Sequence, residues 1–165
     1  MKVIDNVLVG LHPHIKSSGF ISGMLKGSFR ETWERSEDQA FQVMDLLGIS
    51  SFHSRIVGSL PFGIQKLVEL ARALALRPKL LLLDEPAAGM NEQETRELSK
   101  LIMEIREEIG VTVLMVEHDM NLVTGISDRI CVLDSGAVIC QGLPEEVSKD
   151  KKVIEAYLGK EEVLA

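Results

Sequence analysis

Apolar residues recur at helical spacing in four stretches of the chain. The stretches are residues 1–11, Trp33–Leu47, Gly63–Leu76 and Asn91–Ile109. Because residues three and four positions apart share one face of a helix, each stretch predicts an amphipathic helix. The intervening residues 12–33 hold Pro13 among glycines and serines, which predicts an irregular segment. Gly48 and Gly110 directly follow two of the helices and are expected to end them. Asn91, with Glu94 three residues later, is expected to cap the start of the fourth helix.

Short apolar runs predict strands between and after the later helices. The runs are Lys79–Leu83, Val111–Val116, Arg129–Leu133 and Ala137–Gln141. Leu80–Leu83 shows no alternation with polar residues, so this strand is expected to be buried on both faces. A short helix is predicted over Asp119–Ile126, and Pro144 opens a last helical stretch that ends near Gly159. Strands that alternate with helices predict an α/β fold with a mostly parallel sheet.

The last two strands are predicted to form a hairpin across Ser135-Gly136. A two-residue turn of this type is typical of antiparallel neighbours. It places Cys131 opposite Cys140, the two cysteines of the chain. Two cysteines cannot form a disulfide framework, and reduced thiols are expected in a cytosolic chain.

The composition of the chain argues against two functional classes, nucleic-acid binders and membrane-spanning proteins. The chain has 165 residues, 45% of them hydrophobic, which is enough for a core and suggests about one domain. A net charge of −7 and an aromatic content of 4% argue against a nucleic-acid binder. No apolar run approaches the roughly 20 residues that span a bilayer, so the chain is not expected to cross a membrane itself.

Two carboxylates directly follow the first predicted strand. Asp84 and Glu85 come at its carboxyl end, where open α/β sheets bind ligands, and Pro86 turns the chain immediately afterwards. An aspartate there can hold Mg²⁺ through water, and a glutamate can polarise an attacking water. An acidic turn after a core strand is the structural alternative for this segment alone.

Two further segments carry candidate chemistry. His118 follows the next strand, so neighbouring strands would bring it to the same sheet edge as Glu85. Ser59–Lys66 joins turn residues to a helix start, where free backbone N–H groups and the helix dipole attract anions. Taken separately, each segment is compatible with an ordinary loop.

Together, these segments resemble the ATP-binding cassette of ABC transporters. The similar motifs are the signature at Leu60–Gln65, Walker B at Leu80–Glu85, the D-loop at Ala87–Asn91 and the switch histidine at His118. The Leu60-Pro61-Phe62-Gly63 run, the D-loop and the tail from Gly142 to Gly159 are most similar to the ATP-binding subunit of branched-chain amino-acid transporters. This resemblance implies a partial P-loop NTPase fold with a helical subdomain, lacking the P-loop strand.

The resemblance also implies roles for particular residues. Glu85 would be the general base, His118 a contact to the γ-phosphate of ATP, and Asp84 the residue that holds Mg²⁺ through water. The further residues expected at ATP are Leu60, Pro61, Phe62, Gly63, Gln65, Gly89 and Asn91. The signature residues among them would serve the ATP of a second, head-to-tail cassette.

By the same resemblance, the chain divides into two parts. Residues 1–78 would form the helical subdomain with the signature motif and its helix. Residues 79–165 would form the half of the α/β core that carries Walker B, the D-loop and the switch histidine, followed by the tail. The implied partners are the second cassette and transmembrane permease subunits, and the implied place is the cytoplasm, peripheral on the inner face of the plasma membrane.

The phosphate-binding P-loop motif does not occur in the sequence. Gly58 and Gly63 have its glycine spacing, but Ile64-Gln65 follows where Lys-[Ser/Thr] is required. The sequence is similar to the last two-thirds of a cassette, so we expect a truncated transport ATPase subunit that does not hydrolyse ATP alone. Without the central strand, the isolated chain is expected to be marginally stable or insoluble.

Two alternative interpretations stay open. The chain could be a non-catalytic interaction module that pairs with an intact cassette, or a decayed gene product. A soluble cassette of the DNA-maintenance type is disfavoured by the charge of −7.

Overall fold

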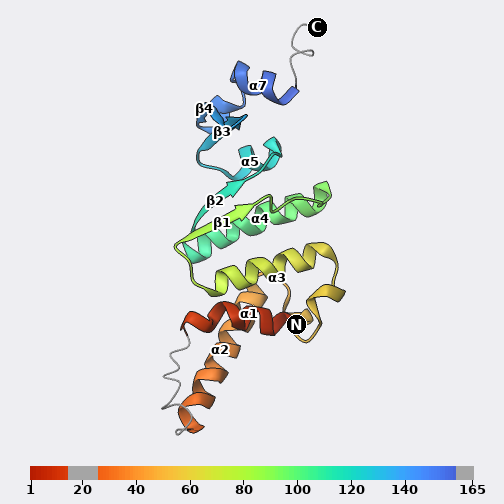
Figure 1. The fold of residues 1–165 in the computed structure, drawn as a ribbon, viewed down its shortest axis with the longest axis vertical. Helices are drawn as coiled ribbons and strands as arrows, with labels where there is room; N and C mark the ends of the chain where they lie inside the picture. The colour runs from red at the N-terminus through yellow and green to blue at the C-terminus, as the bar shows by residue number, and fades with distance from the viewer. Residues whose placement is uncertain (15–25, 159–165) are drawn as a thin grey trace. The chain divides into compact units, whose positions relative to one another are not determined.

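The computed structural model describes residues 1–14 and 26–158 (Figure 1). The chain divides into two compact units. The first unit is Met1–Pro86 with Glu104–Met115. The second is Ala87–Met103 with Val116–Ala165. Most of the predicted helices and strands are present, with shifted bounds.

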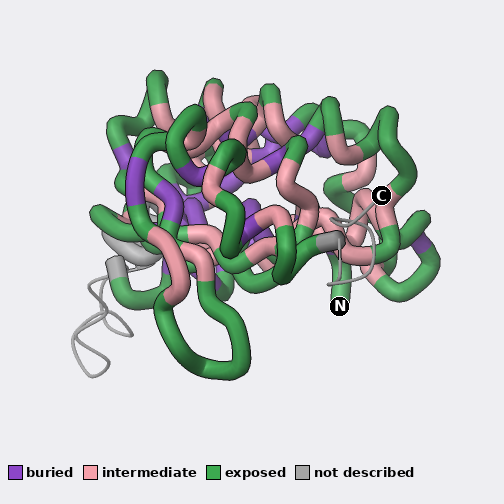
Figure 2. Tube along the Cα trace, turned by 90° about the horizontal axis from the view of Figure 1, so that it is seen from above, coloured by how far each residue is buried: buried purple, intermediate pink, exposed green. Residues whose placement is uncertain are grey.

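Helices form the first part of the first unit. They are α1 (Val3–Leu11), the 3-10 turn η1 (His12–His14), α2 (Lys26–Leu46), the 3-10 turns η2 (Ser50–Phe52) and η3 (Val57–Ser59), and α3 (Phe62–Ala75). Helix α1 contacts both α2 and α3. Fully buried side chains such as Val3, Val7, Met44 and Val68 form the core between them, and Figure 2 marks buried positions in purple along the trace.

Helix α2 begins earlier than the sequence predicts. The prediction of an irregular segment over residues 12–33 is wrong for 26–33, which are helical. No proline lies between Lys26 and Trp33, and the segment contains good helix formers. The segment has too few apolar residues to show the helical spacing on which the prediction relied. Residues 15–25 lie outside the described part of the chain.

The glycines predicted to end helices do so. Gly48 has a φ of 66° after α2, and the N–H of Ile49 donates to the carbonyl of Met44 at 2.9 Å. Gly110 has a φ of 69° after α4 (Glu92–Ile109). Such left-handed residues let the chain reverse while the last carbonyls of the helix keep partners.

Strands β1 (Leu80–Asp84) and β2 (Thr112–Val116) form a two-stranded sheet, and α4 connects them. In Figure 1 both arrows point the same way, as a strand–helix–strand crossover requires. The prediction that β1 is buried on both faces is wrong. Leu81 is 4% exposed, whereas Leu80 and Leu82 are 50% and 66% exposed, because only one face of the strand is covered by described residues.

Besides residues 92–103 of α4, the described part of the second unit contains a hairpin and three short helices. Strands β3 (Ile130–Asp134) and β4 (Ala137–Gly142) pair antiparallel. The helices are α5 (Met120–Ile126), α6 (Pro144–Val147) and α7 (Lys151–Leu158). Ile130, Val147 and Val153 are buried together and form the core of this unit.

The hairpin turn is correctly predicted, but its register is not. Ser135 and Gly136 have φ values of 48° and 80°, which suit a two-residue turn between twisted strands. An irregularity between Val132 and Leu133 shifts the register, so that Cys131 faces Gln141 and Cys140 faces Val132. The predicted pairing of the two cysteines is therefore wrong, and both are free thiols.

Within the described residues, no helix is both long enough and apolar enough to span a membrane.

Candidate functional site

Asp84 and Glu85 lie where strand β1 ends, as the sequence predicts. Both residues are exposed, and Asp84 is the last residue of the strand. Glu85 has a φ of 44°, a left-handed conformation that residues other than glycine rarely adopt. Strain of this kind is often kept at functional sites, and here it sets the direction in which the carboxylate leaves the strand.

Leu60–Gln65 forms an ordered bend that leads into helix α3. Leu60 is 6% exposed and anchors the segment, and Pro61 occupies the position before the first helical residue, Phe62. The side-chain amide of Gln65 donates to the carbonyl of Leu60 at 2.8 Å and so fixes the bend. The helix starts beside Gly63, and the N–H groups of its first turn have no partner within the helix.

Phe62 is an exposed aromatic residue at the start of α3. Its side chain is 54% exposed, and the Lys66 ammonium lies 5.5 Å from the ring centroid. The start of α3 therefore combines backbone N–H groups that have no partner within the helix, the helix dipole and the Lys66 ammonium, which also pairs with Glu69 at 3.6 Å. These features suit an anionic group.

The segment after Pro86 turns into helix α4. The N–H of Met90 donates to the carbonyl of Ala87 at 3.0 Å, and Gly89 has a φ of 78°. The Asn91 side chain accepts from the N–H groups of Gln93 and Glu94 at 2.9 and 3.0 Å, which caps the helix. The Glu94 carboxylate accepts in return from the Asn91 N–H at 2.9 Å, completing the predicted capping box.

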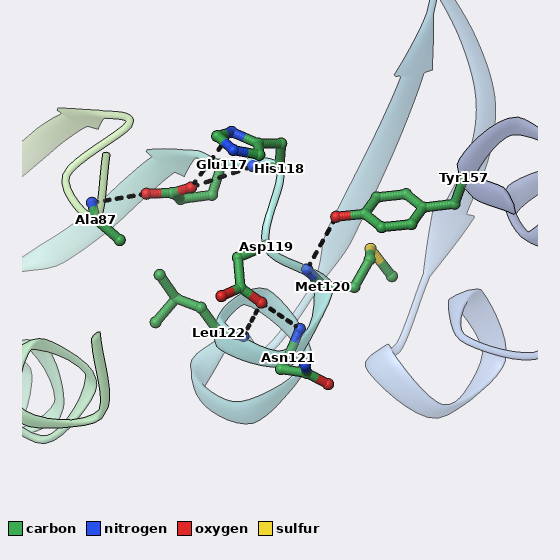
Figure 3. A network of polar contacts seen from close by, with 8 residues as sticks. All are labelled: Ala87, Glu117, His118, Asp119, Met120, Asn121, Leu122 and Tyr157. Carbon is green, nitrogen blue, oxygen red and sulfur yellow. Dashed lines mark hydrogen bonds and ion pairs between the residues drawn. The ribbon is translucent and has the colours of Figure 1, made fainter. Parts of the chain in front are cut away.

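Side-chain acceptors hold the turn that carries His118 (Figure 3). Asp119 accepts from the N–H groups of Asn121 and Leu122 at 2.9 and 3.2 Å and caps α5. The Tyr157 hydroxyl accepts from the N–H of Met120 at 3.3 Å, which ties α7 to this turn. The His118 side chain itself is 75% exposed.

Glu117 connects this turn to the segment after Pro86. Its Oε1 accepts from the Ala87 N–H at 2.8 Å, and its Oε2 accepts from the His118 N–H at 3.1 Å. No role for Glu117 or Tyr157 follows from the sequence motifs alone. A signal for Glu117 exists in the sequence, because it is an acidic residue at the end of an apolar strand.

The predicted site residues fall into both compact units. Asp84, Glu85 and the Leu60–Gln65 segment belong to the first, whereas Gly89, Asn91 and His118 belong to the second. In the described residues, no group of three or more His, Cys, Asp or Glu side chains could hold a metal ion.

Comparisons with known proteins identify the class. The family model for ABC transporters matches residues 4–88, which is more than half of the chain. The chain is also similar to solved structures of this class. It superposes on the ADP conformation of MJ1267, an ATP-binding cassette of an ABC transporter, with a TM-score of 0.77 and 30% identity. That match covers 96% of this chain and 63% of the other.

The chain belongs to the ABC transporter family, and its fold matches part of the ATP-binding cassette. A second family model, for branched-chain amino acid ATP-binding cassette transporters, matches residues 137–163.

Two relatives agree with this branch of the family. The chain is 43% identical over 160 residues to LivG of Escherichia coli (strain K12), a high-affinity branched-chain amino acid transport ATP-binding protein. It is 41% identical over 160 residues to BraF of Pseudomonas aeruginosa, which has the same description. Each alignment covers 96% of this chain and 62% of the relative, so the chain spans about three fifths of their length.

Proposed function

We propose that the chain acts as an ATP-binding and ATP-hydrolysing part of an importer for branched-chain amino acids. The observation that carries the proposal is the 43% identity over 160 residues to LivG. The tail supports the same branch, because residues 137–163 match the branched-chain amino acid model. The exposed carboxylates at the end of β1 are of the type that can activate a water molecule for hydrolysis.

Glu85 is the proposed general base. Its backbone conformation directs the carboxylate out of the strand, and its exposure leaves it accessible to a water molecule. A positioned carboxylate that accepts a proton from the attacking water accelerates hydrolysis by about 10²- to 10⁴-fold. Asp84 would hold Mg²⁺ through water, and bound Mg²⁺ would neutralise phosphate charge.

His118 and the α3 start are the proposed phosphate contacts. His118 is 75% exposed, which leaves its ring accessible to a phosphate group, and its backbone N–H donates to Glu117. The residues proposed to meet the ATP of a second cassette, or to line that interface, are Leu60, Pro61, Phe62, Gly63, Gln65, Gly89 and Asn91.

The proposed assembly is a head-to-tail cassette dimer bound to transmembrane permease subunits. In it, residues 1–78 form the helical subdomain and residues 79–165 the remaining core and tail. This places the chain at the cytoplasmic face of the plasma membrane, as a peripheral subunit.

The test is ATP hydrolysis and leucine uptake by the transporter assembled with the protein expressed from its native gene. Glu85→Gln should lower kcat by about 10²-fold or more and abolish labelled leucine uptake, since the amide cannot accept the proton. Glu107→Gln, at an exposed position on α4, should match the wild type. Equal kcat values for Glu85→Gln and wild type would remove Glu85 from the mechanism.

A second candidate function rests on the sequence around Gly58 and Gly63, which lacks the lysine and hydroxyl residue of a P-loop. In this case, the chain is a non-catalytic partner of an intact cassette. Intact-mass measurement of the native protein separates the two. A mass above 18.3 kDa with peptides containing a P-loop supports the ATPase subunit. A mass of 18.3 kDa, with co-purification of an intact cassette, supports the partner.

A further inference from the structure

Glu117 is a buried carboxylate beside an exposed histidine. Its side chain is 1% exposed, whereas that of His118 is 75% exposed. Removing a carboxylate from water is unfavourable unless hydrogen bonds replace the lost hydration. Here both oxygens accept from backbone N–H groups, Oε1 from Ala87 at 2.8 Å and Oε2 from His118 at 3.1 Å (Figure 3).

The bond to Ala87 joins residues 30 positions apart in the chain, whereas the bond to His118 joins adjacent residues. Ala87 follows Glu85 by two residues and begins the turn that leads to α4. His118 directly follows Glu117. One side chain therefore holds the backbone just after the proposed general base and the backbone of the proposed phosphate contact.

Capping of helix α5 does not explain this side chain. Asp119 accepts from the N–H groups of Asn121 and Leu122, and Tyr157 accepts from that of Met120. These two residues complete the start of the helix without Glu117. What Glu117 adds is the connection between the turn at Ala87 and the turn at His118.

We propose that Glu117 is a positioning residue that fixes the turn after Glu85 and the backbone of His118 relative to one another. Its consequence for hydrolysis depends on the proposed function, but the connection itself does not. The geometry demands two acceptors on one side chain. Glutamine at this position offers one acceptor and one donor, so one of the two N–H groups must lose its partner.

Amide hydrogen exchange tests whether Glu117 connects Ala87 and His118. It is measured by NMR on the protein expressed from its native gene. In Glu117→Gln, the N–H of Ala87 or of His118 should exchange faster by roughly ten- to a hundredfold, as expected when a hydrogen bond to a charged acceptor is lost. In Glu117→Ala, both should. The N–H groups of Asn121 and Leu122, held by Asp119, should exchange as in the wild type.

Two exchange results would overturn the proposal. One is unchanged exchange at Ala87 and His118 in Glu117→Ala. The other is faster exchange at Asn121 and Leu122 as well, because that would show general loosening of the unit rather than loss of one connection. Glu107→Gln is the matched control for removing one glutamate charge.

Hydrolysis by the assembled transporter tests the catalytic consequence. Glu117→Gln should lower kcat by roughly 10- to 100-fold and leave the KM for ATP within about twofold, because misplacement of catalytic groups acts on the reaction step. Faster amide exchange with an unchanged kcat would refute the positioning role. If the wild type hydrolyses no ATP, the proposed function fails, and the exchange measurement alone decides whether Glu117 makes the connection.

Discussion

Gly10 allows helix α1 to approach helix α3 closely, so replacing it with alanine should destabilise the first compact unit. A Cβ built on Gly10 would lie 2.2 Å from the carbonyl oxygen of Arg72 and 3.0 Å from the Cβ of Ala75. Observed Cβ atoms essentially never lie within 3.0 Å of such a neighbour. The closest atom belongs to the backbone of α3, so no side-chain rotation relieves the clash.

The magnitude follows from two opposing terms. Overpacking of a closely packed contact costs about 1–3 kcal/mol, and a backbone neighbour at this distance favours the upper end. Alanine gains about 1 kcal/mol over glycine inside a helix. We therefore expect Gly10→Ala to lower the free energy of unfolding by about 2 kcal/mol, the difference between the two terms.

Urea unfolding followed by circular dichroism measures this change, with Gly125→Ala as the control. Gly125 lies in α5, and no described atom is within 4 Å of its added Cβ. The control should gain up to about 1 kcal/mol from helix propensity alone. If Gly10→Ala matches the wild type or exceeds it while Gly125→Ala behaves as expected, the close approach of α1 to α3 is refuted.

Three further predictions concern single features. Asn91→Ala removes the cap of α4 and should lower the free energy of unfolding by about 1 kcal/mol, measured by urea titration. Burial and the Asp150 carboxylate raise the pKa of the Cys140 thiol, so less thiolate forms at a given pH. Asp150→Asn should therefore speed iodoacetamide modification of Cys140 at pH 8, read by mass spectrometry; an unchanged rate contradicts the assigned cause. Leu82 is 66% exposed on β1, so Leu82→Lys should reduce self-association of the isolated chain, measured by light scattering.

Local chemistry in the sequence predicted several features correctly. Asn91 and Glu94 form the expected capping box, and Gly48 and Gly110 take the left-handed conformation where their helices end. Each of these depends on residues only a few positions apart, so the sequence contains the whole interaction.

Strand register and strand burial were less predictable, because they depend on the elements that pack beside each strand. The irregularity between Val132 and Leu133 shifts the hairpin register, and no turn residue marks it. The run Leu80–Leu83 is apolar throughout, yet the described residues cover only one of its faces. An apolar run shows which residues can be buried, whereas the elements packed around them decide which are.

Gly10 and Glu117 show the same limit at the level of single residues. Glycine has the lowest helix propensity of the residues in α1. Position 10 nevertheless requires glycine, because the Arg72 carbonyl of α3 leaves no room for a Cβ. Glu117 is a charged residue after an apolar strand, and nothing nearby in the sequence indicates that its side chain is 1% exposed. Its acceptor role arises only when the Ala87 N–H, 30 residues away, is brought to it. A buried acidic residue at a strand end, next to a candidate catalytic histidine, is therefore a position where a long-range backbone contact should be sought first.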